Sequence, residues 1–139
     1  MSDALRTELH KDVMASVVPK RVLLVEDNRD ALSGLYMLLS NAGFSVLMAE
    51  NGDEALFLID RGVRPDVIVL DLMMPKVSGW DILKQLQQDP ELREIPVIVV
   101  TALDREDAHV VGADVVMQKP IHPGELISEV QRLATGKEE

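Results

Sequence analysis

Four apolar runs in this sequence each end in a residue that can hold a phosphoryl group or a hard cation. After the runs come Glu26 with Asp27, then Asp71, Thr101 and Lys119. If the runs are neighbouring parallel strands, their carboxyl ends open on one sheet edge, which is where open α/β sheets bind ligands. Three carboxylates, a hydroxyl and an ammonium would then share one pocket. The runs cover residues 21–25, 66–70, 95–100 and 113–118.

This set of residues is suited to phosphoryl transfer assisted by a divalent cation. Three neighbouring carboxylates cannot all stay ionised without a counter-charge, which Mg²⁺ would supply. A carboxylate can also attack phosphorus and form an aspartyl phosphate. Lys119 and the hydroxyl of Thr101 could stabilise the phosphoryl oxygens. Each residue has an ordinary structural role as well, such as a helix cap at Asp27 or Asn28, but their joint occurrence at successive strand ends favours function.

The loop after the first run argues against a nucleotide or flavin site. Such ligands need a Gly-rich or hydroxyl-rich loop, because backbone amides must approach the phosphates. The sequence has Glu26-Asp27-Asn28 there, and neither G-x-G-x-x-G nor G-x-x-x-x-G-K-[ST] occurs anywhere in it. Two carboxylates would repel a phosphate and attract a cation.

The elements that must position these residues alternate between strands and amphipathic helices. Strands that are apolar on both faces and separated by helices indicate a parallel sheet covered on both sides. We therefore predict a doubly wound α/β fold of the (βα)₅ type with right-handed crossovers. The predicted strands are 21–26, 44–49, 66–70, 95–100 and 115–118, and the predicted helices are 28–41, 52–61, 78–88, 105–111 and 122–134.

Length and composition fit one globular domain of 139 residues. The net charge of −10 disfavours direct binding to nucleic acid or to an anionic membrane. There is no cysteine, no secretory signal and no apolar run long enough to span a bilayer, so we expect a cytoplasmic protein.

Three segments are predicted. Residues 1–19 form an N-terminal extension, residues 20–135 the domain, and residues 136–139 a charged tail. In the extension, apolar residues recur every four positions, which is compatible with an amphipathic helix. The extension is either a frayed tail or an added helix that packs on the domain or on a second subunit, so a homodimer is possible. The recurring residues are Leu5, Leu9, Val13 and Val17.

Taken in order, these motifs resemble the receiver domain of two-component response regulators, the family of the chemotaxis protein CheY. The resemblance covers Lys20 to about Leu133 and implies a flavodoxin-like sheet with strand order 2-1-3-4-5. Its carriers are V-L-L-V-E-D-N at 22–28, P-D-V-I-V-L-D-L-M-M-P at 65–75, S-G-W at 78–80, P-V-I-V-V-T-A at 96–102, G-A-D at 112–114 and K-P at 119–120.

The resemblance also implies a role for each residue of the predicted pocket and a cis peptide before Pro120. The phosphoryl group would come from the phosphohistidine of a sensor histidine kinase. The implied roles are Asp71 as phosphoacceptor, Thr101 as switch hydroxyl, Lys119 as partner of the phosphoryl group, and Glu26, Asp27, Asp71 and the main-chain carbonyl of Met73 as Mg²⁺ ligands.

The function that follows is a single-domain response regulator of a phosphorelay that switches protein–protein contacts with an unidentified output protein. It would not be an enzyme beyond phosphorylating itself from phosphohistidine and slowly dephosphorylating itself. The alternative is a receiver-fold interaction module that works without phosphorylation. An aspartate-nucleophile phosphatase is disfavoured, because a leaving-group acid is expected where Met73 stands.

Two departures from the family pattern concern the output of the switch. The last strand carries Val116 where members usually have an aromatic residue. The stretch from Thr101 to Lys119 is about four residues shorter than the family norm, which shortens the fourth helix. We therefore expect output through a different surface. Met73 and Leu103 flank the pocket with apolar side chains, which should hinder attack by water and slow the reset.

Overall fold

The computed structural model describes residues 18–104, 108 and 110–136. The predicted helix at 105–111 falls largely outside this range, as do residues 1–17 of the extension and 137–139 of the tail. None of the described helices is long and apolar enough to cross a membrane. The strands are β1 (Arg21–Val25), β2 (Ser45–Ala49), β3 (Val67–Asp71), β4 (Val97–Thr101) and β5 (Val115–Gln118). The helices are α2 (Arg29–Asn41), α3 (Gly52–Asp60), α4 (Gly79–Gln87) and α6 (Pro123–Ala134), with a 3₁₀ turn η1 (Leu92–Glu94).

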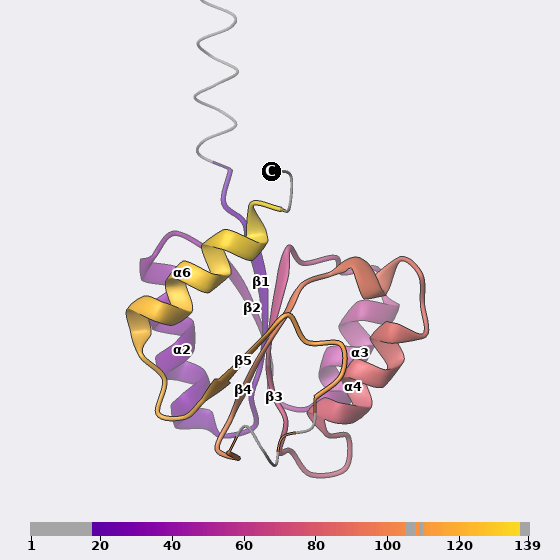
Figure 1. The fold of residues 1–139 in the computed structure, drawn as a ribbon. Helices are drawn as coiled ribbons and strands as arrows, with labels where there is room; N and C mark the ends of the chain where they lie inside the picture. Colours follow the sequence, from indigo (N-terminus) through magenta and orange to yellow (C-terminus); the bar gives the residue numbers. More distant parts are fainter. Residues whose placement is uncertain (1–17, 105–107, 109, 137–139) are drawn as a thin grey trace, which may run out of the picture.

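The five described strands form one parallel sheet in the order β2-β1-β3-β4-β5. This confirms the doubly wound α/β fold and the strand order that the family resemblance implied. Helices α2 and α6 cover one face of the sheet, and α3 and α4 cover the other (Figure 1). The five predicted strands and the predicted helices at 28–41, 52–61, 78–88 and 122–134 agree with the observed ones to within two residues at each end.

The two faces of the sheet bury two separate apolar clusters. Alternate residues of each strand point to opposite faces, so Leu23 and Leu70 pack on the α3–α4 side while Leu24 and Val69 pack on the α2–α6 side. Strands β3 and β4 are buried along their whole length. This two-sided burial explains why the strands read as continuous apolar runs in the sequence.

Short polar side chains start the helices that follow the strands. The side chain of Asn28 accepts a hydrogen bond from the amide of Ala31, so Asn28 is the N-cap of α2. Ser78 and Asp81 form a capping box at the start of α4, as the S-x-x-D pattern predicts. These caps fix where α2 and α4 begin, directly after the loops that carry the carboxylates of β1 and β3.

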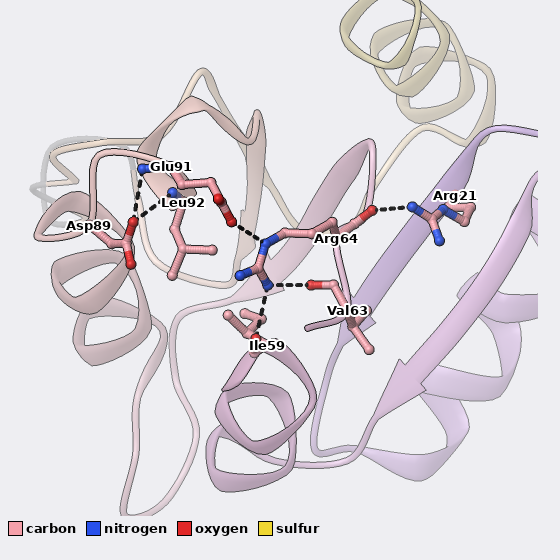
Figure 2. A network of polar contacts seen from close by, with 7 residues as sticks. All are labelled: Arg21, Ile59, Val63, Arg64, Asp89, Glu91 and Leu92. Atoms are coloured by element: carbon pink, nitrogen blue, oxygen red, sulfur yellow. Dashed lines mark hydrogen bonds and ion pairs between the residues drawn. The ribbon is translucent and has the colours of Figure 1, made fainter. Parts of the chain in front are cut away.

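A polar network ties the elements together at the amino ends of the strands (Figure 2). The guanidinium of Arg64 donates through Nε to Oε1 of Glu91 at 2.7 Å. Its Nη1 donates to the carbonyl oxygens of Ile59 at 2.9 Å and Val63 at 3.0 Å. The carbonyl of Arg64 accepts from Nη2 of Arg21 at 2.6 Å. One side chain thus joins the end of α3, the start of η1 and, through its own backbone, β1.

We predict that Arg64→Ala lowers the free energy of unfolding by about 1–2 kcal/mol, because two partly buried carbonyls lose a charged donor. Arg64→Lys should recover only part of the loss, since an ammonium cannot reproduce the planar fork. Urea denaturation measures both. The matched control is Arg93→Ala, whose exposed side chain makes no hydrogen bond or ion pair within the described residues. Equal midpoints for Arg64→Ala and Arg93→Ala would contradict the prediction.

Candidate functional site

Three carboxylates converge at the carboxyl ends of β1 and β3. Glu26 and Asp71 are 1% and 5% exposed, whereas Asp27 is exposed. One oxygen from each of the three lies within 4.8 Å of the other two. The parallel sheet brings them together, because β1 and β3 are neighbours and their ends align. The predicted acidic cluster is therefore present.

Glu26 is held in place by contacts to both carboxylate oxygens. Nζ of Lys119 lies 2.8 Å from Oε1, and the amide of Asn28 donates to Oε2 at 3.1 Å. The amide of Glu26 itself donates to the carbonyl of Ala49 at 3.2 Å, which ties the residue to β2. By contrast, no hydrogen bond reaches the carboxylate of Asp27 from the part of the chain that the structure describes.

Asp71 is the most perturbed acid of the cluster. Burial, and then the charge of Glu26, raises the pKa of Asp71 to about 6, although Lys119 and the amide of Met73 act in the opposite direction. Nζ of Lys119 lies 4.0 Å from Oδ2, and the Met73 amide donates to Oδ1 at 3.4 Å. The ammonium is therefore nearer to Glu26 than to Asp71. Asp71 thus keeps an incompletely compensated charge next to the surface.

The start of α4 packs directly against the backbone of Asp71. A Cβ added to Gly79 would collide with the carbonyl of Asp71 and the Cα of Leu72. The amide of Gly79 also donates to the carbonyl of Leu72 at 2.9 Å. Only glycine fits this position, so it fixes the path of the loop that leaves Asp71 and carries Met73. Gly79 is part of the S-G-W motif at 78–80, but its packing role was not predicted. The only feature near it in the sequence that indicates structure is the N-cap residue Ser78.

Thr101 and Lys119 lie side by side at the ends of β4 and β5. The amide of Lys119 donates to the carbonyl of Thr101 at 2.7 Å, and the peptide bond to Pro120 is cis, as the resemblance implied. Thr101 is completely buried, and its Oγ1 accepts from the amide of Leu103 at 3.1 Å. Val100, the residue before Thr101, is the register partner of Asp71. The hydroxyl therefore sits one strand away from the carboxylate cluster.

Within the described residues, Met73 meets the cluster through its backbone amide, which donates to Oδ1 of Asp71 at 3.4 Å. Met73 is 55% exposed in the loop after β3 and borders the site with an apolar side chain. Leu103 is half-buried on the other side, two residues after Thr101. The structure thus joins Glu26, Asp71 and Lys119 by direct contacts. The proposed ligand role of the Met73 carbonyl stays a prediction.

The chain belongs to the response regulator receiver domain family, whose model matches residues 22–131. Among curated relatives, the transcriptional regulatory protein CpxR of Klebsiella pneumoniae is 41% identical over 117 residues, which is 81% of this chain and 48% of CpxR. This chain therefore spans about half the length of CpxR. The polar-differentiation response regulator DivK of Brucella anthropi is 38% identical over 118 residues, covering 82% of this chain and 95% of DivK.

Solved structures give the same assignment. The receiver domain of a signal transduction histidine kinase from Syntrophus aciditrophicus superposes with a TM-score of 0.79 at 34% identity, covering 86% of this chain and 93% of that one. The response regulator TrrA of Thermotoga maritima, solved in complex with Mg²⁺ and BeF, has a TM-score of 0.74 at 30% identity and covers 82% of this chain and 98% of that one. Receiver domains are phosphate-accepting modules of two-component signalling that bind Mg²⁺ at an acidic pocket, and this chain has such a pocket.

We predict that Asp71→Asn stabilises the protein at neutral pH in the presence of a chelator. The folded-state pKa of Asp71 is raised from 3.8 to about 6, so the folded protein loses stability as the pH rises from about 4 to above 6. The amide cannot ionise, and the free energy of unfolding should increase by about 1–3 kcal/mol near pH 7.5 and by clearly less near pH 4. Urea denaturation at both pH values measures the gain. Asp60→Asn, at an exposed position, is the control; an equal gain there would refute the prediction.

Proposed function

We propose that this chain is a phosphorylation-controlled switch of a two-component phosphorelay. Asp71 accepts a phosphoryl group from the phosphohistidine of a sensor histidine kinase, and the phosphorylated form changes its contacts with an output protein. The observation that carries the proposal is the buried Asp71 beside Glu26, Asp27 and Lys119 at one sheet edge. A cytoplasmic location, the absence of direct nucleic-acid binding and a possible homodimer stay predictions.

The residues at this edge fit a magnesium ion. Mg²⁺ prefers oxygen ligands, and the three carboxylates offer one oxygen each within 4.8 Å of one another. Glu26, Asp27 and Asp71 would hold the ion together with the Met73 carbonyl. Both oxygens of Glu26 also accept hydrogen bonds, from Lys119 and from the amide of Asn28, which orient this carboxylate. When bound, the ion supplies positive charge for the phosphoryl oxygens.

Asp71, Lys119 and Thr101 would carry out the rest of the phosphoryl transfer. A carboxylate oxygen of Asp71 forms the new P–O bond as the P–N bond to the donor histidine breaks, and the electron pair of that bond stays on the imidazole nitrogen. Lys119 lies 4.0 Å from Asp71 and can move its charge toward the incoming phosphoryl group. The hydroxyl of Thr101 would donate a hydrogen bond to a phosphoryl oxygen.

The competing proposal is an interaction module that does not need phosphorylation. It is motivated by the short stretch from Thr101 to Lys119 and by Val116. Val116 on β5 is half-buried against the α3–α4 side of the sheet, where the family pattern has an aromatic residue. The polar contacts described at the carboxyl edge do not include Val116. The two proposals therefore differ in whether Asp71 takes up phosphate at all.

We predict that incubation with acetyl phosphate and Mg²⁺ adds one phosphoryl group to the protein and none to Asp71→Asn. Intact-protein mass spectrometry measures the gain. Chelation of Mg²⁺ should abolish it, because the carboxylate charges are then uncompensated. A folded protein that gains no mass with Mg²⁺ present would refute the proposal and favour the module that works without phosphorylation.

We predict that Met73→Asn shortens the lifetime of the phosphorylated form. The exposed Met73 side chain borders Asp71 with an apolar surface that cannot orient an attacking water, whereas an amide can hydrogen-bond to one. The decay of the phosphorylated mass after removal of the donor measures the lifetime. Met37→Asn on α2 is an exposed control expected to leave the lifetime unchanged. Equal lifetimes for wild type and Met73→Asn would rule the idea out.

A further inference from the structure

The segment that follows β4 is fastened to the end of β5 and to Thr101. Nε2 of Gln118 donates to Oδ1 of Asp104 at 2.7 Å. Closer to the site, the amide of Leu103 donates to Oγ1 of Thr101 at 3.1 Å. Gln118 is the register partner of Thr101 in the sheet. Residues 102–104 are therefore placed by two hydrogen bonds that both begin at the phosphorylation edge.

The same segment is fastened on its far side to the first turn of α4. Nε1 of Trp80 donates to the carbonyl of Ala108 at 2.9 Å. The amide of Ala108 in turn donates to the carbonyl of Asp104 at 3.0 Å. Ala108 is 2% exposed, whereas Trp80 is 36% exposed. A chain of hydrogen bonds thus runs from the buried Thr101 region to a partly exposed indole.

Trp80 also sits next to the phosphoacceptor through the backbone. It follows Gly79, which has no room for a Cβ against the carbonyl of Asp71. The indole is therefore joined to the site by two routes, one through α4 and one through the segment after β4. The route through α4 is a close-packed backbone contact at Gly79, which leaves little room for movement. A shift of the segment after β4 should therefore change mainly the hydrogen bond between Trp80 and Ala108.

The indole lies on the face of the sheet where the family's aromatic residue is missing. Val116 packs with the cluster on the α3–α4 side, and Gln118 shares its face because side chains alternate along a strand. Thr101 lies two residues after Val99 on β4, so the two side chains point to the same face, and Val99 belongs to that cluster too. Helix α4, which carries Trp80, covers this face (Figure 1).

We propose that Trp80 relays the state of the phosphorylation site, in place of an aromatic residue on β5. A Thr101 hydroxyl that moves toward a phosphoryl oxygen on Asp71 leaves the Leu103 amide without its acceptor. An unpaired partly buried amide is costly, so residues 102–104 shift, and the shift reaches Ala108 and the indole. The inference rests on the proposed phosphorylation of Asp71, and it assigns the output to the surface around Trp80.

The test uses the fluorescence of Trp80, which is the only tryptophan in the sequence. The full chain is treated with Mg²⁺ and acetyl phosphate, and emission and intact mass are recorded on the same sample. We expect emission to change as the phosphorylated mass appears and to return as the phosphate is lost. Asp71→Asn should show neither change, which corrects for any direct effect of Mg²⁺ or of the donor on the indole.

Variants of the hydrogen-bonded segment then test the route. Gln118→Ala should still gain the phosphoryl mass but lose most of the emission change, because residue 104 is no longer tied to β5. Asp104→Leu should behave in the same way, whereas Asp104→Asn keeps an acceptor for the Gln118 amide and should keep the response. Gln131→Ala on α6 is the matched control, since Gln131 is exposed and its side chain makes no hydrogen bond within the described residues. Circular dichroism confirms that each variant is folded.

The outcomes separate this inference from the proposed function. No mass gain in the wild type overturns the proposed function and the relay together. A mass gain with unchanged emission overturns the relay alone, as does an emission change that survives in both Gln118→Ala and Asp104→Leu. Loss of the response in these two variants, with retention in Asp104→Asn and Gln131→Ala, supports the relay.

Discussion

The ion pair between Lys119 and Glu26 is the contact on which the acidic edge of the sheet depends. Lys119 follows β5 and Glu26 follows β1, so this pair spans β3 and β4, which lie between those strands. Glu26 is 1% exposed and would be costly to keep ionised without a partner. With three carboxylates and one ammonium, the edge carries a net charge of about −2, which is the charge that a divalent cation neutralises. Of the two buried acids, Asp71 is the less well compensated by the protein, since Lys119 lies nearer to Glu26.

Much of this arrangement could be predicted from the sequence, because it follows from local patterns. Apolar runs with intervening helices fix a parallel sheet, and a parallel sheet aligns all its strand ends on one edge. Glu26, Asp71 and Lys119 are therefore brought together by topology alone, although they are far apart in the chain. The helix starts at Asn28 and Ser78 were likewise visible, because caps act within three residues.

Contacts between distant segments could not be predicted in this way. The hydrogen bond from Trp80 to Ala108 joins residues that are 28 positions apart, and Arg64 reaches Glu91 over 27 positions. A lone tryptophan or arginine has many possible partners, and nothing within a few residues selects one of them. The collision that keeps residue 79 a glycine also depends on how α4 approaches β3. Such constraints appear only once the elements are packed in three dimensions.

The amino and carboxyl ends of the strands, here the amino and carboxyl edges of the sheet, differ in how their polar groups are satisfied. This difference bears on signalling. At the amino edge, Arg64 satisfies backbone carbonyls and an acid, which holds the ends of the elements in one arrangement (Figure 2). At the carboxyl edge, burial and like charge raise the pKa of Asp71, so the protein stores unfavourable energy there. A ligand that relieves this energy shifts a conformational equilibrium only as far as its affinities for the two states differ. In the proposed switch, a fixed amino edge would confine movement to the carboxyl edge. There the amide of Leu103 is bonded to Thr101, and the carbonyl of Ala108 to Trp80, each by one hydrogen bond that could exchange.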